Sequence, residues 1–221
     1  MRRDPETKNQ SLPPHVIESL LQRQSAQLGI VLNEANIAAL VKFAALIAKW
    51  NRRFNLVGSS KPDDLVRNHI VDCLAATPFI DGKRVVDVGA GAGFPGIVIA
   101  LMRPQSNIIL VESSQRKSRF LTQVAIELSL RNVEVVCERV ENWEFAQPID
   151  CVVCRGYGSL RKFYDDTRAL HPSGCRLVAL KASLNDAEIT ELQLDPESIS
   201  LQVLEVPDWD HRHLVTITPS Q

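Results

Sequence analysis

The chain has 221 residues, of which 45% are hydrophobic and 23% are charged, and its formal net charge at pH 7 is −1. This length and composition are typical of one large soluble domain that buries a substantial core. The sequence contains neither an apolar run near the roughly 20 residues that span a bilayer nor an apolar signal segment, so we expect a cytoplasmic protein. Because the net charge is close to zero, a nucleic acid could bind only a local basic surface.

The five cysteines lie in apolar sequence surroundings, which is typical of reduced thiols in a cytoplasmic protein. Cys151 and Cys154 have the spacing of a CxxC motif, but they fall in an expected strand, where residues three apart point to opposite faces. Two thiols placed in this way cannot readily bind one metal ion, so we interpret both as buried structural cysteines. His211 and His213 are also isolated beside an expected strand. We therefore expect no metal site.

Residues 12–80 have the apolar periodicity of helices, whereas residues 1–11 are polar and are expected to form a flexible tail. Each expected helix has a recognisable start, either a proline or an asparagine that can cap it. The first helix begins at Pro13-Pro14 and ends at Gly29, the second follows Asn33 and runs to Trp50–Leu56, and the third begins at Pro62 and ends near Ala76. We interpret this region as a helical cap on the rest of the chain.

From Arg84 onward, β-branched segments alternate with amphipathic ones. The expected strands are residues 84–88, 107–111, 133–137, 149–154, 175–180, 201–206 and 213–218. The expected helices lie near residues 95–103, 115–130, 159–170 and 185–194. This alternation favours a doubly wound, mostly parallel seven-stranded sheet with helices on both faces. The loop of residues 207–212 is too short for a crossover helix, so the last strand should be antiparallel, and residues 81–221 should form the α/β core of a single domain.

The segment of residues 85–96 is the most informative part of the chain. A β-branched run ends around Asp87, and a glycine-rich turn and an apolar helix follow directly. This order opens nucleotide-binding α/β domains, in which the backbone approaches a ligand more closely than a Cβ atom would allow. Gly91-x-Gly93-x-x-Gly96 also satisfies the dinucleotide fingerprint, so the glycines alone leave NAD as an alternative.

Three features favour S-adenosylmethionine (AdoMet) over NAD as the ligand of this turn. Asp87 lies two residues before the first glycine, where AdoMet sites of doubly wound proteins typically carry an acid. Glu112 ends the next strand, where a carboxylate can accept hydrogen bonds from ribose hydroxyls, although NAD sites use the same arrangement. The antiparallel ending of the sheet is typical of AdoMet-dependent methyltransferases and unusual for NAD domains. Together these features predict an AdoMet site.

Three ordered segments carry a resemblance to a known family: Trp50-Asn51-x-x-x-Asn55-Leu56, Arg67–Leu74 and Asp87–Gly96. In these segments the chain resembles the bacterial small-subunit rRNA guanine-N7 methyltransferases, also called glucose-inhibited division protein B. The resemblance covers about residues 30–218, and it extends to Arg139-Val140-Glu141, Cys154-Arg155-Gly156, Leu180-Lys181 and Arg212–Val215. The family often has Ser-Arg-Ala at Cys154-Arg155-Gly156 and Lys-Gly at Lys181-Ala182, and neither departure removes a charged group.

The resemblance implies a class I AdoMet-dependent methyltransferase with a Rossmann-like fold. Within the family pattern, Gly89 and Phe94 line the AdoMet loop and Glu112 binds the ribose. Val140 and Glu141 fall beside the adenine. The full set of expected cofactor-binding residues is Asp87, Gly89, Gly91, Gly93, Phe94, Glu112, Val140, Glu141 and Arg155.

The activity that the resemblance implies is methyl transfer from AdoMet to N7 of a guanine in a loop of 16S rRNA. Guanine N7 carries an unprotonated lone pair at neutral pH, so it can displace the methyl group in line without a general base. The expected site therefore positions its substrates and needs no catalytic acid or base. The candidate substrate-positioning residues are Arg155, His69, Asp72 and Lys181.

The implied partner is 16S rRNA or the small ribosomal subunit, including a precursor, and we expect a monomer with no membrane contact. Three basic clusters could neutralise RNA phosphates: Arg52-Arg53, Arg116-Lys117-x-Arg119 and Arg161-Lys162. Trp50 is expected in the core rather than as a stacking platform. Two alternatives remain: an RNA- or ribosome-binding protein without activity that retains the fold, and a methyltransferase of this fold that acts on a small molecule.

Overall fold

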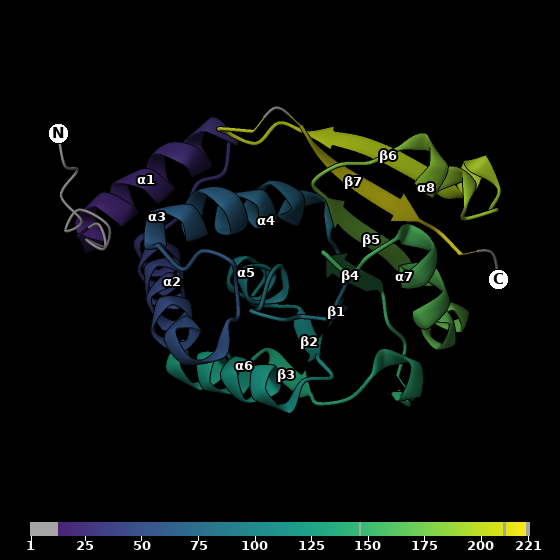
Figure 1. Cartoon of the computed structure of the whole chain (residues 1–221), viewed down its shortest axis with the longest axis horizontal. Coiled ribbons are helices and arrows are strands. Elements are labelled where there is room, and N and C mark those ends of the chain that lie inside the picture. The colour runs from purple at the N-terminus through teal and green to yellow at the C-terminus, as the bar shows by residue number, and fades with distance from the viewer. Residues whose placement is uncertain (1–12, 146, 210, 220–221) are drawn as a thin grey trace, which may run out of the picture.

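A seven-stranded sheet forms the centre of the molecule, in the order β3-β2-β1-β4-β5-β7-β6 (Figure 1). The structure is a computed structural model that describes residues 13–145, 147–209 and 211–219, so the expected tail over residues 1–11 lies outside the described residues. The strands are β1 (Arg84–Val88), β2 (Asn107–Val111), β3 (Val133–Val136), β4 (Cys151–Arg155), β5 (Arg176–Lys181), β6 (Ile199–Leu204) and β7 (Arg212–Ile217). The expected boundaries of β1 and β2 are confirmed, and those of the other strands differ by one or two residues.

The strand directions confirm the expected topology. Strands β1 to β5 pair in parallel, whereas β7 lies between β5 and β6 and is antiparallel to both. The inner parallel strands are rich in valine, isoleucine and leucine because both of their faces are buried, whereas the residues of the edge strand β3 are only partly buried or exposed. The carboxyl ends of the parallel strands therefore meet at one edge of the sheet, where ligands bind in open α/β folds.

Helices cover both faces of the sheet, as the alternating pattern predicts. The helices are α1 (Pro14–Gln27), α2 (Glu34–Phe54), α3 (Pro62–Leu65), α4 (Val71–Ala76), α5 (Gly96–Met102), α6 (Gln115–Glu127), α7 (Leu160–Asp166) and α8 (Asp186–Thr190). In the view of Figure 1, α2 and α5 lie to the left of the central strands and α7 to their right. The two faces have separate cores: Val85 of β1 packs with α2 and α5, whereas Val86 packs with α7.

The third expected helix has its predicted start at Pro62 and its predicted end at Ala76, but it is not α-helical throughout. Between α3 and α4 the chain forms a π-helical turn over Val66–Ile70, in which the N–H of Val71 bonds to the carbonyl of Val66. The wider turn adds a residue to the helix and changes the direction in which His69 projects. The other expected helices are shorter than predicted at their carboxyl ends, because short 3₁₀ turns or loops replace their last residues.

The end of α2 explains one of the segments that carry the family resemblance. Asn55 adopts a left-handed conformation with φ of 46°, which stops the helix. The side-chain amide of Asn51 then accepts a hydrogen bond from the N–H of Val57 (2.9 Å) and donates one to the carbonyl of Val57 (3.1 Å). Trp50 packs its ring 5.4 Å from that of the buried Phe120, so it belongs mainly to the core, as expected.

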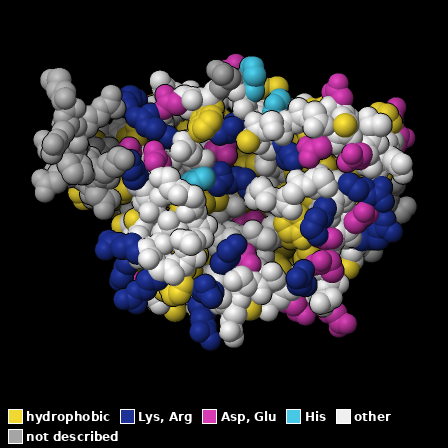
Figure 2. Space-filling model, viewed as in Figure 1, with side chains coloured by type: hydrophobic (Ala, Val, Ile, Leu, Met, Phe, Trp, Pro, Cys, Tyr) yellow, Lys and Arg dark blue, Asp and Glu magenta, His cyan; other side chains and the backbone are white. Residues whose placement is uncertain are grey.

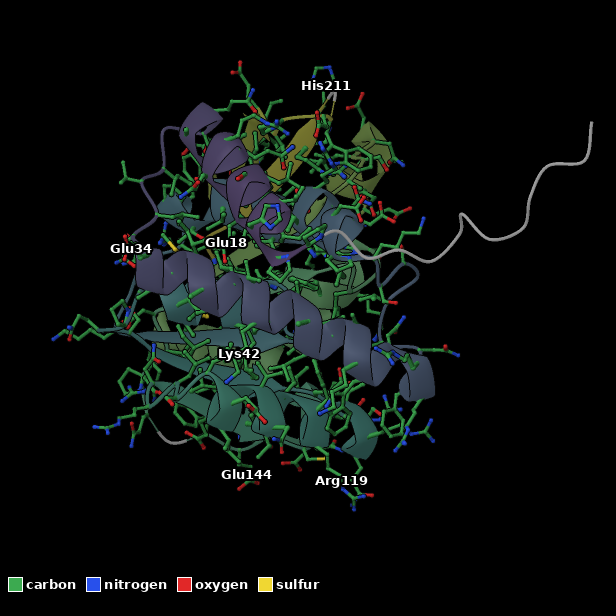
Figure 3. The ribbon with its side chains drawn as sticks, turned by 90° about the vertical axis from the view of Figure 1, so that its left-hand side faces the viewer. Glu18, Glu34, Lys42, Arg119, Glu144 and His211 are labelled. Carbon is green, nitrogen blue, oxygen red and sulfur yellow. The ribbon has the colours of Figure 1, made fainter. Side chains whose placement is uncertain are left out.

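The helical cap and the α/β core share one hydrophobic cluster. Leu40 and Phe43 of α2 are fully buried in the same cluster as Ile97 of α5 and Leu121 of α6. Lys42 joins α2 to α6 by an ion pair with Glu127 (3.1 Å), and Figure 3 shows the two helices side by side. None of the described helices is both long enough and apolar enough to cross a membrane.

Candidate active site

The glycine-rich turn between β1 and α5 is held by carboxylates from two strands. Asp87 of β1 is completely buried, and its Oδ2 accepts a hydrogen bond from the N–H of Gly96 (2.8 Å). Glu112, which follows β2, accepts the N–H of Gly91 with Oε2 (2.9 Å) and the N–H of Ser114 with Oε1 (2.8 Å). Both acids therefore shape the turn through its backbone.

The environment of Asp87 is suited to a cationic ligand group. Burial raises the pKa of this carboxyl from 3.8 to about 7, while the Gly96 N–H and the Arg155 guanidinium act in the opposite direction. Its second oxygen, Oδ1, is buried and has no hydrogen-bond partner among the described residues. AdoMet carries an α-ammonium group, and a buried carboxylate with an unused oxygen is the acceptor that such a group requires. The residues present therefore fit this cofactor.

A cavity of ≈ 200 Å³ lies at the carboxyl ends of β1 and β2, and Gly89, Val140 and Glu141 are among its lining residues. Gly89 has a φ of +69°, and a Cβ atom there would lie 2.8 Å from Cδ2 of Tyr157. Tyr157 also lines the cavity, and its hydroxyl donates to Asp166 (2.8 Å). Sequence reasoning missed Tyr157, although the glycines on either side of it indicate a turn after β4.

The other expected cofactor-binding residues lie outside this lining. Gly93 faces the core, because a Cβ atom there would lie 2.7 Å from Cγ1 of Ile97. Phe94 is only 5% exposed, and its ring packs against Phe43 and His69. The residues expected to bind the cofactor that do not line the ≈ 200 Å³ cavity are Asp87, Gly91, Gly93, Phe94, Glu112 and Arg155.

A second cavity, of ≈ 560 Å³, brings the four candidate substrate-positioning residues together. Its lining residues include His69 from the π-helical turn, Asp72 from α4, Arg155 from β4 and Lys181 from β5. We call it the Arg155 cavity. Lys181 donates to the carbonyl of Gly158 (3.0 Å) and pairs with Glu188 (2.8 Å), so its ammonium group already has partners.

Arg155 connects the sheet to the helical cap. Its Nη1 pairs with Oδ2 of Asp72 (3.1 Å) and donates to the carbonyl of Asn68 (3.3 Å), and its Nη2 contacts Nδ1 of His69 (2.6 Å). Its guanidinium carbon lies 5.1 Å from the ring centroid of Phe94. One side chain thus joins the end of β4, the π-helical turn and the glycine-rich turn.

Two arginines share one carboxylate in this cavity. Asp72 is 6% exposed, and its Oδ1 lies 3.2 Å from Nε of Arg212, while its Oδ2 pairs with Arg155. The guanidinium carbon of Arg212 lies 4.0 Å from the ring centroid of Trp209, which is 39% exposed and also lines the cavity. Sequence reasoning did not single out Trp209, because no motif spacing marks the β6–β7 loop.

His69 is neutral at pH 7 in this environment. Burial and then the charge of Arg155 lower its pKa from 6.5 to about 4. Its ring centroid lies 5.0 Å from that of Phe94, so the imidazole is packed as well as hydrogen-bonded.

The CxxC pair has the structural role that the sequence predicts. Cys151 belongs to the core on the α2 side of the sheet and Cys154 to the core on the α7 side, and both are free thiols. Burial raises the pKa of the Cys151 thiol to about 12. The described part of the chain contains no group of three or more His, Cys, Asp or Glu residues that could hold a metal ion.

The strand order, the antiparallel β7, the glycine-rich turn after β1 and the acid after β2 define a class I AdoMet-dependent methyltransferase. Two solved structures share the fold: a SAM-dependent methyltransferase from Aquifex aeolicus (TM-score 0.51, 18% identity, 70% of this chain and 92% of that one) and a precorrin-6y C5,15-methyltransferase from Geobacter metallireducens (TM-score 0.52, 16% identity, 75% and 92%).

The family model for rRNA small subunit methyltransferase G matches residues 36–215, and the chain belongs to this family. It is 39% identical over 206 residues to ribosomal RNA small subunit methyltransferase G of Pseudomonas syringae pv. tomato. The aligned region covers 93% of this chain and 97% of that relative. The protein of the same name from Laribacter hongkongensis is 38% identical over 193 residues, with coverages of 87% and 93%. Membership of this family excludes the NAD interpretation of Gly91-x-Gly93-x-x-Gly96.

Proposed function

We propose that this protein transfers the methyl group of AdoMet to N7 of a guanine in 16S rRNA, within the small ribosomal subunit or its precursor. The observation that carries the proposal is the meeting of His69, Asp72 and Arg155 at one cavity beside the glycine-rich turn. A cavity of ≈ 560 Å³ is in the size range of small-ligand pockets, so it has room for a base turned out of an RNA loop.

Residues around the ≈ 200 Å³ cavity would hold the cofactor. Bound AdoMet supplies an electrophilic methyl group on a sulfonium ion. Gly89 leaves room for it beside the backbone, and Val140 and Glu141 would border the adenine. Asp87 has an unused oxygen for the ammonium group, and the carboxylate of Glu112 has lone pairs left for the ribose hydroxyls beyond its two backbone bonds.

The chemistry that we propose needs no proton acceptor from the protein. The N7–carbon bond forms as the carbon–sulfur bond breaks, and the positive charge passes from sulfur to the base. The side chains of the Arg155 cavity agree with this mechanism. Nδ1 of His69 is engaged by Arg155, and Asp72 is paired with two arginines, so neither is poised as a general base.

A basic surface at the corner of α2 and α6 supports RNA as the substrate. We define the basic corner as Lys49, Arg52, Arg53, Arg116, Lys117 and Arg119, none of which forms an ion pair within 4.0 Å with a described residue. Lys and Arg side chains gather there at the lower left of the space-filling view (Figure 2), and Arg119 projects outward from α6 in Figure 3. By contrast, Arg161 and Lys162 of the third predicted cluster pair with Asp165 and Asp166. RNA phosphates would therefore dock at the basic corner.

The protein is proposed to act as a cytoplasmic monomer and as one domain. The helical cap and the α/β core share one hydrophobic cluster, which supports a single domain. Light scattering at micromolar concentration should give the mass of one chain. A stable dimer would contradict this part of the proposal.

The decisive experiment is methyl transfer from labelled AdoMet to small subunits from a strain that lacks this protein, with the modified base mapped. Arg155→Ala should abolish transfer, and Cys154→Ala, which changes the preceding buried residue of β4, should leave it nearly unchanged. A protein that binds RNA but shows no AdoMet affinity by calorimetry would instead be a binding protein that retains the fold. Transfer to a metabolite and none to the subunits would identify a small-molecule methyltransferase.

A further inference from the structure

His69 holds a fixed position at the Arg155 cavity. Its ring is packed on Phe94 with centroids 5.0 Å apart, and its Nδ1 lies 2.6 Å from Nη2 of Arg155. The π-helical turn that carries it is joined to β4 a second time, since Arg155 also bonds the carbonyl of Asn68. A side chain with this support keeps one orientation when a ligand arrives.

The contact with Arg155 determines which nitrogen of His69 carries the proton. A guanidinium group has only donors, so Nδ1 must accept the hydrogen bond. A neutral imidazole that accepts at Nδ1 carries its proton at Nε2, and the low pKa of His69 keeps the ring neutral. None of the side-chain hydrogen bonds among the described residues uses Nε2, and the Asn68 backbone, which also acts on the ring, accepts from Nη1 of Arg155. The cavity is thus lined by a neutral N–H donor that is not in use.

Several other nitrogen donors around the cavity are already engaged, whereas Nε of Arg212, 3.2 Å from Oδ1 of Asp72, has no hydrogen-bond partner among the described residues. Both Nη atoms of Arg155 have partners, Nζ of Lys181 bonds Gly158 and Glu188, and Nε1 of Trp209 donates to the carbonyl of Arg67. The Nε2–H group of His69 is therefore available to donate a hydrogen bond to a nucleobase in the cavity.

We propose that His69 selects guanine by donating its Nε2–H to O6 of the target base, and this inference rests on the proposed function. Guanine presents O6 beside N7 on the same edge, both as acceptors, whereas adenine presents an amino donor at the position of O6. An N–H group placed beside N7 can donate a hydrogen bond to O6 of guanine. With adenine it would meet the amino donor at that position and would stay unpaired. It also leaves the N7 lone pair free, because the bond is made to O6.

A double-mutant cycle tests this pairing. Small subunits are reconstituted with guanine or 2-aminopurine at the mapped position, and 2-aminopurine keeps N7 and the 2-amino group but lacks O6. The wild-type enzyme should lose about tenfold in kcat/KM on 2-aminopurine, the order of one hydrogen bond. His69→Ala should lose about as much on guanine and bring the guanine to 2-aminopurine ratio close to 1. A ratio that stays at its wild-type value in His69→Ala overturns the proposal.

Two amide variants separate the hydrogen bond from a purely structural role. The amide of His69→Gln reaches the Nε2 position and should keep part of the ratio, whereas that of His69→Asn reaches only the Nδ1 position and should lose it. His15→Ala on α1 is the matched control and should leave the ratio unchanged. If His69→Ala does not fold, equal ratios for the Gln and Asn variants overturn the proposal. If the wild-type enzyme transfers no methyl group to guanine, it is the proposed function that fails.

Discussion

At the scale of single residues, Gly89 sets the closest approach of the backbone to the proposed cofactor. Its φ of +69° and the 2.8 Å distance from an added Cβ atom to Tyr157 both exclude a larger residue. We expect Gly89→Val to lower AdoMet affinity by at least a hundredfold in calorimetry. Gly58→Ala is the control, because a Cβ atom there meets nothing within 4 Å, and its affinity should stay at the wild-type value. Unchanged binding by Gly89→Val would place the cofactor elsewhere.

The raised pKa of Asp87 makes a second prediction about AdoMet binding. With a pKa of about 7, the ionised fraction of this carboxyl rises by roughly eightfold between about pH 6 and 7.5, while the α-ammonium of the ligand stays mostly protonated. Calorimetry should therefore show affinity rising by up to that factor across this range. Asp87→Asn can still accept the Gly96 N–H, and its affinity should be lower and independent of pH.

The free enzyme gives an independent check on Asp87. Because the pKa in the folded state lies above its unfolded value of 3.8, the folded state binds the proton more tightly. This group therefore stabilises the fold at low pH, and its contribution is lost as pH rises from about 4 to 7. Asp87→Asn should remove that decline in the free energy of unfolding. Asp150→Asn, at the opposite end of the sheet, should keep it.

The residues of the site differ in how far the sequence could predict them. Asp87 and Glu112 were predictable, because carboxyl ends of parallel strands meet at one edge, but their bonds to the Gly96 and Gly91 amides depend on the folded turn. Arg155 and Asp72 are 83 positions apart, and although the family resemblance made both of them candidate substrate-positioning residues, their pairing follows only from tertiary structure. Tyr157 has no motif that marks it, and its role follows from packing against Gly89.

At the scale of elements, the π-helical turn is the part of the fold that local pattern could not predict. The spacing of apolar residues around this turn is compatible with an ordinary α-helix. The extra residue in the wider π turn becomes favourable only through contacts with other parts of the fold. Arg155 bonds the Asn68 carbonyl and His69, and Arg67 pairs with Asp208 of the β6–β7 loop. Tertiary contacts of this kind decide between an α and a π turn, and they place His69 at the cavity.

The basic corner, formed by α2 and α6, is expected to bind RNA more strongly than the basic pair on α7. Arg53→Gln with Arg116→Gln removes two cations without ion-pair partners, so RNA binding should weaken and the slope of log K against log salt should fall by about 2. Arg161→Gln with Lys162→Gln removes the same charge from α7, where aspartates already neutralise it. That double variant should bind like the wild type. Equal losses in both would mean that net charge, rather than the basic corner, governs binding.

At the scale of the whole molecule, the helical cap and the sheet should unfold as one unit. Leu40 of α2 is fully buried in the cluster that also contains Val85 of β1, while Trp143 lies in the core on the opposite face of the sheet. Leu40→Ala removes buried methyl groups and should cost about 2–5 kcal/mol. If the strands couple the two faces of the sheet, this loss of stability must also lower the urea midpoint that Trp143 fluorescence reports.

This test needs Trp143 as the sole fluorescent reporter, so it is run with Trp50→Phe and Trp209→Phe in the background. Far-UV circular dichroism and Trp143 fluorescence should then shift together in Leu40→Ala, whereas Val31→Ala, at a position 93% exposed, should move neither. A circular dichroism transition that separates from the Trp143 transition would show two folding units. In that case the cap could move relative to the sheet, and Arg155 would be a contact that forms late in folding. With coincident transitions, the contacts of Arg155 with Asn68, His69 and Asp72 are part of one cooperative core, which is what a site that works by positioning its substrates requires.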